Sequence, residues 1–153
     1  MALAGGKPAS AATVARLSAD LLAGGYSLCA SVTGRSMSPT VRHGDKILVA
    51  PVGGRCWSPG DVAYTLCCGR IVVHRVLARF PEEPTEPVLL LGGDGNLHSY
   101  DLVPARHAIG RVVAVYRGGQ PKRLDTPIRT CRGRVCAWTS YLWWAIVWRR
   151  LGP

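Results

Sequence analysis

The sequence predicts a mainly β fold of the α+β class: a small, mostly antiparallel β domain or partly open barrel, with a short N-terminal helix and a C-terminal helix rich in tryptophan. Short apolar runs alternate with Gly, Pro and Asp turn signals at close intervals. The 18 glycines and 11 prolines leave few long helical patterns. With 153 residues and 48% hydrophobic content, the chain suits one compact core and is too short for two ordinary domains.

Residues 1–25 are expected to form a flexible N-terminus and a short amphipathic helix. The first ten residues are rich in Gly and Ala. After them, apolar residues recur at helical spacing, at Val14, Leu17, Leu21 and Leu22. Gly24 and Gly25 then end the pattern. Charged residues interrupt every apolar stretch, which argues against a signal peptide or a membrane span in this segment.

Residues 26–117 are expected to form the main domain. Its predicted strands are 26–32, 46–52, 62–66, 71–77, 88–91 and 109–116. The third and fourth of these are separated only by a short turn containing glycine, so they are predicted to form a hairpin. An acidic, proline-rich stretch at 81–87 is predicted as a surface loop.

The basic charge is concentrated at the C-terminal end. The formal net charge is +10, but residues 1–116 hold 11 Lys and Arg against 8 Asp and Glu, whereas residues 117–153 hold 8 against 1. A basic tail attracts either nucleic acid or an anionic lipid surface, and its neighbours decide between them. We expect no nucleic-acid partner, because the tail continues into an apolar segment.

The C-terminal region is predicted as a basic linker, 118–134, followed by a hydrophobic helix, 135–150. Residues 135–148 are uncharged and hold four of the five tryptophans. As a helix these fourteen residues would span about 21 Å, less than the roughly 30 Å of a hydrocarbon core. Tryptophan with arginine at both ends is typical of the bilayer interface. The segment is therefore predicted to be an interfacial or shallow membrane anchor; the alternative is a helix docked on its own domain or on a partner, in a cytoplasmic protein.

The cysteines do not predict a metal site or a disulfide framework. No pair shows the spacing of a zinc ribbon or a redox motif, so no metal and no cofactor is expected. Most are expected to be small apolar core residues. The six are Cys29, Cys56, Cys67, Cys68, Cys131 and Cys136.

Ser36 is the candidate nucleophile. It lies in a Gly-x-Ser-Met-x-Pro-Thr turn that precedes an apolar strand. A serine hydroxyl is nearly inert at neutral pH, so it needs a rigid turn, a neighbouring base and amide donors for the developing oxyanion. Gly34 permits close backbone approach, and Pro39 restricts the backbone on both sides of its peptide bond. These residues suit a turn that presents a side chain.

His74 is the candidate base. Strand alternation puts it on one face with Val72 and Val76, and Arg75 on the other. An imidazole with an ordinary pKa near 6.5 can accept a serine proton at neutral pH. This role needs a carboxylate to fix the tautomer, and Asp94 and Asp101 are the candidates. Turn formation is the alternative role of Asp94, and a surface or capping role that of Asp101.

Taken in order, six sequence blocks resemble those of type I signal peptidases: GRSMSPT, GDKILV, PGDVAY, VVHRVL, GGDGNLHSYD and IGRVV. The usual bacterial members have a lysine where this chain has His74. The chain is therefore most similar to the archaeal and endoplasmic-reticulum branch, which uses serine and histidine with aspartate support. The resemblance covers residues 34–115 and implies the β fold of that family.

Position by position, the resemblance implies that Ser36 is the nucleophile and His74 the general base. The altered Gly-Asp-Gly-Asn block leaves both Asp94 and Asp101 open as the carboxylate of the site. Asp101 is slightly preferred. The supporting residues it implies are Gly34, Met37, Pro39 and Ser99. The family stabilises the oxyanion with the nucleophile's own N–H, in some members together with a serine two positions earlier, where this chain has Gly34.

The function implied is that of a serine endopeptidase, which cleaves a peptide or preprotein through an acyl-enzyme at a membrane. Two alternatives remain. A self-cleaving regulator of the LexA type would bind DNA, but its base is a lysine, and only 35 residues precede Ser36 here. A non-catalytic domain would use the cleft to bind peptide or to dock at membranes.

Overall fold

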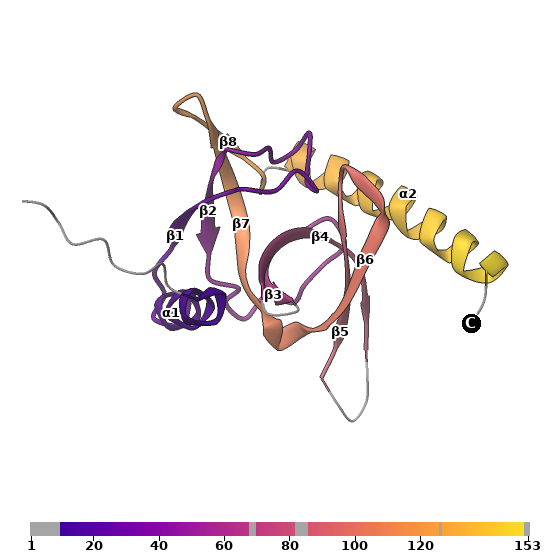
Figure 1. Ribbon diagram of the computed structural model, residues 1–153, viewed down its shortest axis with the longest axis horizontal. Helices are drawn as coiled ribbons and strands as arrows, with labels where there is room; N and C mark the ends of the chain where they lie inside the picture. Colours follow the sequence, from indigo (N-terminus) through magenta and orange to yellow (C-terminus); the bar gives the residue numbers. More distant parts are fainter. Residues whose placement is uncertain (1–9, 68–69, 82–85, 126, 152–153) are drawn as a thin grey trace, which may run out of the picture.

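The protein is a mainly antiparallel β structure whose sheet curls into a half-barrel, with one helix at each end of the chain (Figure 1). The computed structural model describes residues 10–67, 70–81, 86–125 and 127–151. The antiparallel sheet and the two helices confirm the predicted β-rich class. The elements are α1 (Ala11–Ala23), β1 (Leu28–Ser31), β2 (Lys46–Ala50), β3 (Val62–Cys67), β4 (Arg70–Phe80), β5 (Val88–Gly93), β6 (Asn96–Pro104), a short 3-10 helix (Ala105–His107), β7 (Ala108–Arg117), β8 (Gln120–Arg123) and α2 (Pro127–Leu151).

The strands form one sheet in the order β1-β2-β7-β3-β4-β5-β6, and β8 pairs with β7. All the pairs are antiparallel, including the predicted β3–β4 hairpin. Strand β7 joins the two halves, because it pairs with β2 on one side and with β3 on the other. This arrangement leaves β1, β6 and β8 each with a single partner strand, so all three are edge strands.

Two strands were not expected from the sequence. Residues 96–104 form β6, in a stretch for which the sequence pattern predicts no strand. Residues 120–123, expected within a linker, form β8, whose four residues are all exposed. A strand with no buried face has no alternation of apolar residues in its sequence. Strand β8 is therefore defined by its pairing with β7. The expected linker 118–134 also contains the start of α2.

The core lies inside the curled sheet and under α2. Ile47 and Val49 of β2 alternate into one buried cluster. On β5, Leu89 and Leu91 face a second cluster, which includes Trp57. Leu90 points to the opposite face and is buried as well, in the cluster that α2 completes. The two helices therefore bury apolar surface that the sheet alone would expose.

Helix α1 begins at an N-cap, Ser10, whose side chain accepts a hydrogen bond from the backbone N–H of Thr13. Its buried face consists of Ala15, Ser18 and Leu22. Apolar residues on the neighbouring face stay exposed, namely Val14, Leu17 and Leu21. Residues 1–9, expected to be flexible, lie outside the described part of the chain.

Helix α2 is longer than the predicted segment and packs against the sheet along β4. Ala137 is fully buried beside Leu77 and Leu90, with Tyr141 and Trp144 packed against the same cluster. The other side of the helix exposes large apolar side chains: Val135, Trp138, Leu142, Trp143 and Ile146. Within the described residues, no helix combines the length and apolar character needed to cross a bilayer.

The cysteines match expectation only in part. Of the four whose side chains are described, Cys67 is buried and Cys136 is half-buried, whereas Cys29 and Cys56 are exposed. Cys29, Cys56 and Cys136 are free thiols. The expectation that most would be core residues is wrong for the two exposed ones, which lie on the edge strand β1 and in the loop after β2.

Candidate active site

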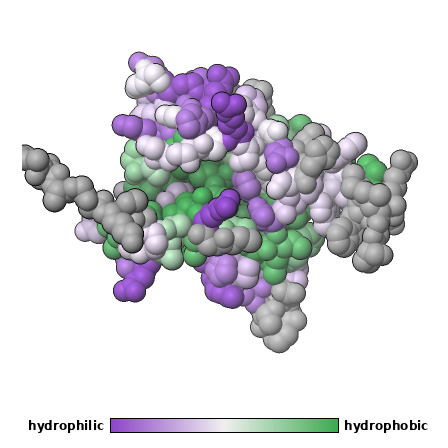
Figure 2. Space-filling view, in the orientation of Figure 1, coloured by the Kyte–Doolittle hydropathy of each residue, from purple (hydrophilic) through white to green (hydrophobic). Residues whose placement is uncertain are grey.

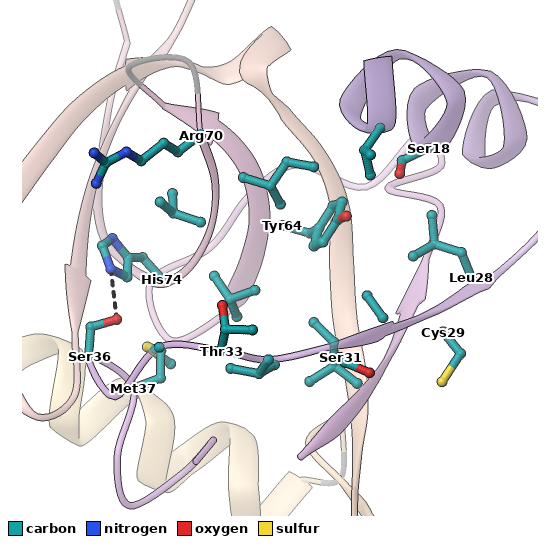
Figure 3. Close-up of a pocket in the computed structure, with 18 of the residues that line it drawn as sticks. Ser18, Leu28, Cys29, Ser31, Thr33, Ser36, Met37, Tyr64, Arg70 and His74 are labelled. Atoms are coloured by element: carbon teal, nitrogen blue, oxygen red, sulfur yellow. Dashed lines mark hydrogen bonds between the residues drawn. The ribbon is translucent and has the colours of Figure 1, made fainter. Parts of the chain in front are cut away.

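Ser36 and His74 meet at one end of a surface groove (Figure 3). The distance between Ser36 Oγ and His74 Nε2 is 3.1 Å, within hydrogen-bonding range. Ser36 comes from the turn after β1, and His74 from the middle of β4, where its side chain is buried. Residues that are 38 positions apart in the sequence are thus joined by one side-chain contact.

Asp101 lies behind the histidine. Its Oδ2 is 3.2 Å from His74 Nδ1, an ion-pair distance without the alignment of a hydrogen bond. Asp101 is on β6, where it pairs with Leu91 of β5. The serine, the histidine and this aspartate therefore form a continuous chain of three side chains.

Asp94 has different partners. Its two carboxylate oxygens accept hydrogen bonds from Arg75 Nε and Nη2, each at 2.6 Å, and one also accepts from Thr40 Oγ1 at 2.5 Å. Arg75 Nη1 donates to the carbonyl of Gly60 at 2.7 Å. The carboxylate and the guanidinium are both buried, so this is an interior ion pair that ties together β4, the turn after Ser36 and the β5–β6 turn.

Arg75 and Thr40 were not identified from the sequence as site residues. The available signal was an arginine within an apolar strand, because a buried arginine requires a partner carboxylate. The predicted alternation places Arg75 on the face opposite His74. The two neighbours on β4 thus contact two different aspartates.

The turn that carries Ser36 is held in place by the buried side chain of Met37 and by the turn between β5 and β6. Met37 is buried in the core cluster that includes Val41. The carbonyl of Ser36 accepts a hydrogen bond from the N–H of Gly95 at 2.8 Å. A Cβ at Gly95 would lie 2.7 Å from the carbonyl oxygen of Ser38, and one at Gly93 would lie 2.4 Å from that of Ser36. The glycines of the Gly-Asp-Gly turn therefore allow it to pack directly against the backbone that carries the serine.

Gly93→Ala is expected to displace Ser36 and to lower both stability, by about 1–3 kcal/mol, and any activity of the site. Backbone atoms cannot move aside as a flexible side chain would. Gly54→Ala is the matched control, because no heavy atom lies within 4 Å of a Cβ there. Urea unfolding of both variants checks the prediction, which fails if the two lose the same stability.

A second ion pair, between Asp45 and Arg117, supports the segment that follows the serine turn. Asp45 accepts hydrogen bonds from Arg117 Nη2 at 2.6 Å and from the backbone N–H of Arg42 at 2.8 Å. The bond from Arg117 is the main cause that holds the pKa of Asp45 below 3.8, while burial opposes it. Because folding lowers the pKa of Asp45, its ion pair with Arg117 adds to the free energy of unfolding above about pH 3.8. This contribution is lost as the pH falls through the lowered pKa.

The remaining predicted site residues lie around the turn. Gly34 lies in the groove wall, with open space where a Cβ would stand. Pro39 follows a cis peptide bond after Ser38 and is exposed. Ser99 is exposed on β6, in an irregular part of the β5–β6 pairing, and makes no hydrogen bond to Ser36 or His74 among the described contacts.

The groove has a volume of about 810 Å³ and runs from the Ser36–His74 pair to α1. Its walls are the exposed face of α1, the edge strand β1 with the residues that follow it, and the first half of β4. Figure 2 shows apolar residues gathered in a hollow beside α1. An edge strand beside a groove offers unpaired backbone groups, the feature with which extended peptides pair in β-strand addition.

The arrangement is suited to nucleophilic catalysis. A histidine within hydrogen-bonding distance of a serine can remove its proton, and a carboxylate at the other ring nitrogen favours the tautomer needed. Comparison with family models, curated proteins and solved structures gave no match to this chain. The chemical argument therefore depends on the geometry and on the sequence motifs.

Proposed function

We propose that the protein is a serine endopeptidase that cleaves a peptide or preprotein through Ser36, His74 and Asp101. The observation that carries the proposal is the contact of 3.1 Å between Ser36 Oγ and His74 Nε2, with Asp101 3.2 Å from the other ring nitrogen. The groove that leads to this pair supports a peptide as the substrate.

In the proposed reaction, Ser36 Oγ attacks the carbonyl carbon of the scissile bond while His74 Nε2 accepts the hydroxyl proton. The tetrahedral intermediate collapses when the protonated His74 gives this proton to the leaving amine, which breaks the C–N bond. Water then loses a proton to His74 and attacks the acyl carbon; the ester C–O bond breaks as His74 returns that proton to Ser36 Oγ, and the new carboxylate of the peptide leaves. Asp101 holds the ring in orientation and stabilises the imidazolium in both steps.

The motif order makes this a peptidase of the signal peptidase type, from the branch that uses histidine as base. The half-barrel sheet is compatible with that type. A self-cleaving regulator of the LexA type is less favoured, since a histidine replaces the lysine of that group. Asp94 is assigned a structural role, because Arg75 and Thr40 already occupy its carboxylate.

The proposal is tested by incubating the protein with a mixed peptide library and identifying products by mass spectrometry. We expect internal cleavage by the wild type and none by Ser36→Ala. Cleavage by both proteins would show a contaminating protease. Peptide binding without cleavage by either would favour the non-catalytic domain.

We further propose that α2 attaches the protein to a membrane surface. One face of the helix is packed on the sheet through Ala137, Tyr141 and Trp144. The opposite face exposes two tryptophans, Trp138 and Trp143, among other apolar side chains. An apolar face with tryptophan in a basic segment suits the interface of an anionic bilayer.

Trp138→Ser is expected to weaken binding to anionic liposomes by about tenfold, because a side chain that is 67% exposed loses its contact with lipid. Tyr26→Ser is the matched control, since Tyr26 is also 67% exposed and comes two residues before β1, a strand that stands apart from α2 in Figure 1. Co-sedimentation measures the effect. Equal binding by the two variants would remove α2 from the membrane contact.

A further inference from the structure

One cation in the groove has no carboxylate partner among the residues that the structure describes. Arg70 begins β4 and lines the groove together with Ser36 and His74 (Figure 3). We propose that Arg70 is a specificity-determining residue that pairs with an acidic side chain of the peptide substrate. This inference deepens the proposed function and rests on it.

Arg70 is the one lysine or arginine among the described residues that line the groove. Elsewhere in the described part of the chain, five arginines form ion pairs with carboxylates: Arg75, Arg106, Arg111, Arg117 and Arg123. Arg70 forms none with the described residues, and no aspartate or glutamate is among the residues that line the groove. Asp101, beside the groove, is paired with His74. The groove therefore has a positive charge that a carboxylate of the substrate could neutralise.

The position of Arg70 limits where this carboxylate must be. Residues 70, 72 and 74 lie on one face of β4, since side chains alternate along a strand. Four residue steps of about 3.3 Å separate Arg70 from His74, roughly 13 Å along the strand. A peptide extended beside β4 therefore brings a side chain within about four residues of the scissile bond to Arg70.

Apart from Arg70 and His74, the groove is lined by uncharged residues, of which more than half are apolar. The wall from α1 presents Leu17 and Leu21, which are about half exposed and do not belong to the domain's own core. Leu28 of β1 and Ile71 of β4 also line the groove. An ion pair bordered by apolar walls is less screened by solvent than one on an open surface. The expected substrate has apolar side chains toward α1 and one acidic side chain near the cut.

The test measures binding separately from cleavage. Fluorescein-labelled peptides of Ala, Leu and Val, with a single Glu, Gln or Lys moved through every position, are titrated into full-length Ser36→Ala at low salt. We expect the Glu peptides to bind about three- to tenfold more tightly than the Lys peptides at the preferred positions. Arg70→Glu in the same background should reverse this preference.

Arg79→Glu is the matched control, because Arg79 is exposed on the same strand and does not line the groove. It makes the same change of charge and should leave the preference unchanged. Equal binding of the Glu and Lys peptides, or a preference that Arg70→Glu does not alter, would overturn the inference.

The same peptides given to the wild type distinguish this inference from the proposed function. Cleavage with a preference for Glu supports both. Cleavage without any preference for charge keeps the peptidase and overturns the role of Arg70. Binding with the Glu preference but without cleavage keeps the role of Arg70 in recognition and overturns the peptidase.

Discussion

His74→Ala is expected to lower kcat for peptide cleavage by about 10⁴-fold or more. Without the imidazole, nothing within hydrogen-bonding distance of Ser36 Oγ among the described contacts can take up its proton. The loss should appear mainly in kcat, because the groove walls remain in place. Steady-state kinetics on a cleaved library peptide measure it.

His107→Ala is the control for this substitution. His107 lies in the short 3-10 helix before β7 and makes no described contact with Ser36. Its loss should leave kcat within about a factor of two, since substitutions away from the reacting atoms alter stability far more often than chemistry. A similar kcat for both variants would contradict the assignment of His74 as base.

Asp101→Asn is expected to lower kcat by about 10³- to 10⁴-fold with little change in stability. An amide at this position no longer stabilises the imidazolium and favours the wrong tautomer. Asp101 contacts His74 and is partly exposed, with 28% of its side chain accessible, so the fold does not depend on its charge. Full activity of Asp101→Asn would remove the residue from the mechanism.

Asp94→Asn, unlike Asp101→Asn, is expected to act mainly on stability. We expect a loss of about 3–5 kcal/mol in the free energy of unfolding. The substitution leaves the guanidinium of Arg75 buried without its counter-charge. Thr40 also loses a charged acceptor. Urea unfolding of Asp94→Asn beside Asp101→Asn compares the two aspartates directly, and equal destabilisation would contradict their separate roles.

Much of the fold followed from apolar patterning. The strands from β1 to β5 and β7 have at least one partly buried face, and the sequence showed each of them. The polar strand β8 was missed, because its hydrogen bonds to β7, and not burial, determine it. The early start of α2 was missed for a related reason: its first residues are basic and small, and they resemble a linker.

The sequence pointed to Ser36, His74 and the two aspartates, but not to Arg75 and Thr40 or to the contacts among these residues. Strand alternation put His74 and Arg75 on opposite faces, yet it did not indicate which aspartate each would meet. That choice depends on the register of β5 with β6 and on the turn between them, where Gly93 and Gly95 pack against the serine turn. These are long-range pairings, which local sequence does not encode.

The most direct test of the central claim is covalent labelling with a serine-reactive phosphonate, followed by peptide mapping. Ser36 should carry the label in the wild type, and the rate of labelling should fall by several orders of magnitude in His74→Ala. Ser36→Ala should take up none. Equal labelling of the three proteins, or a label on any other residue, would contradict the account.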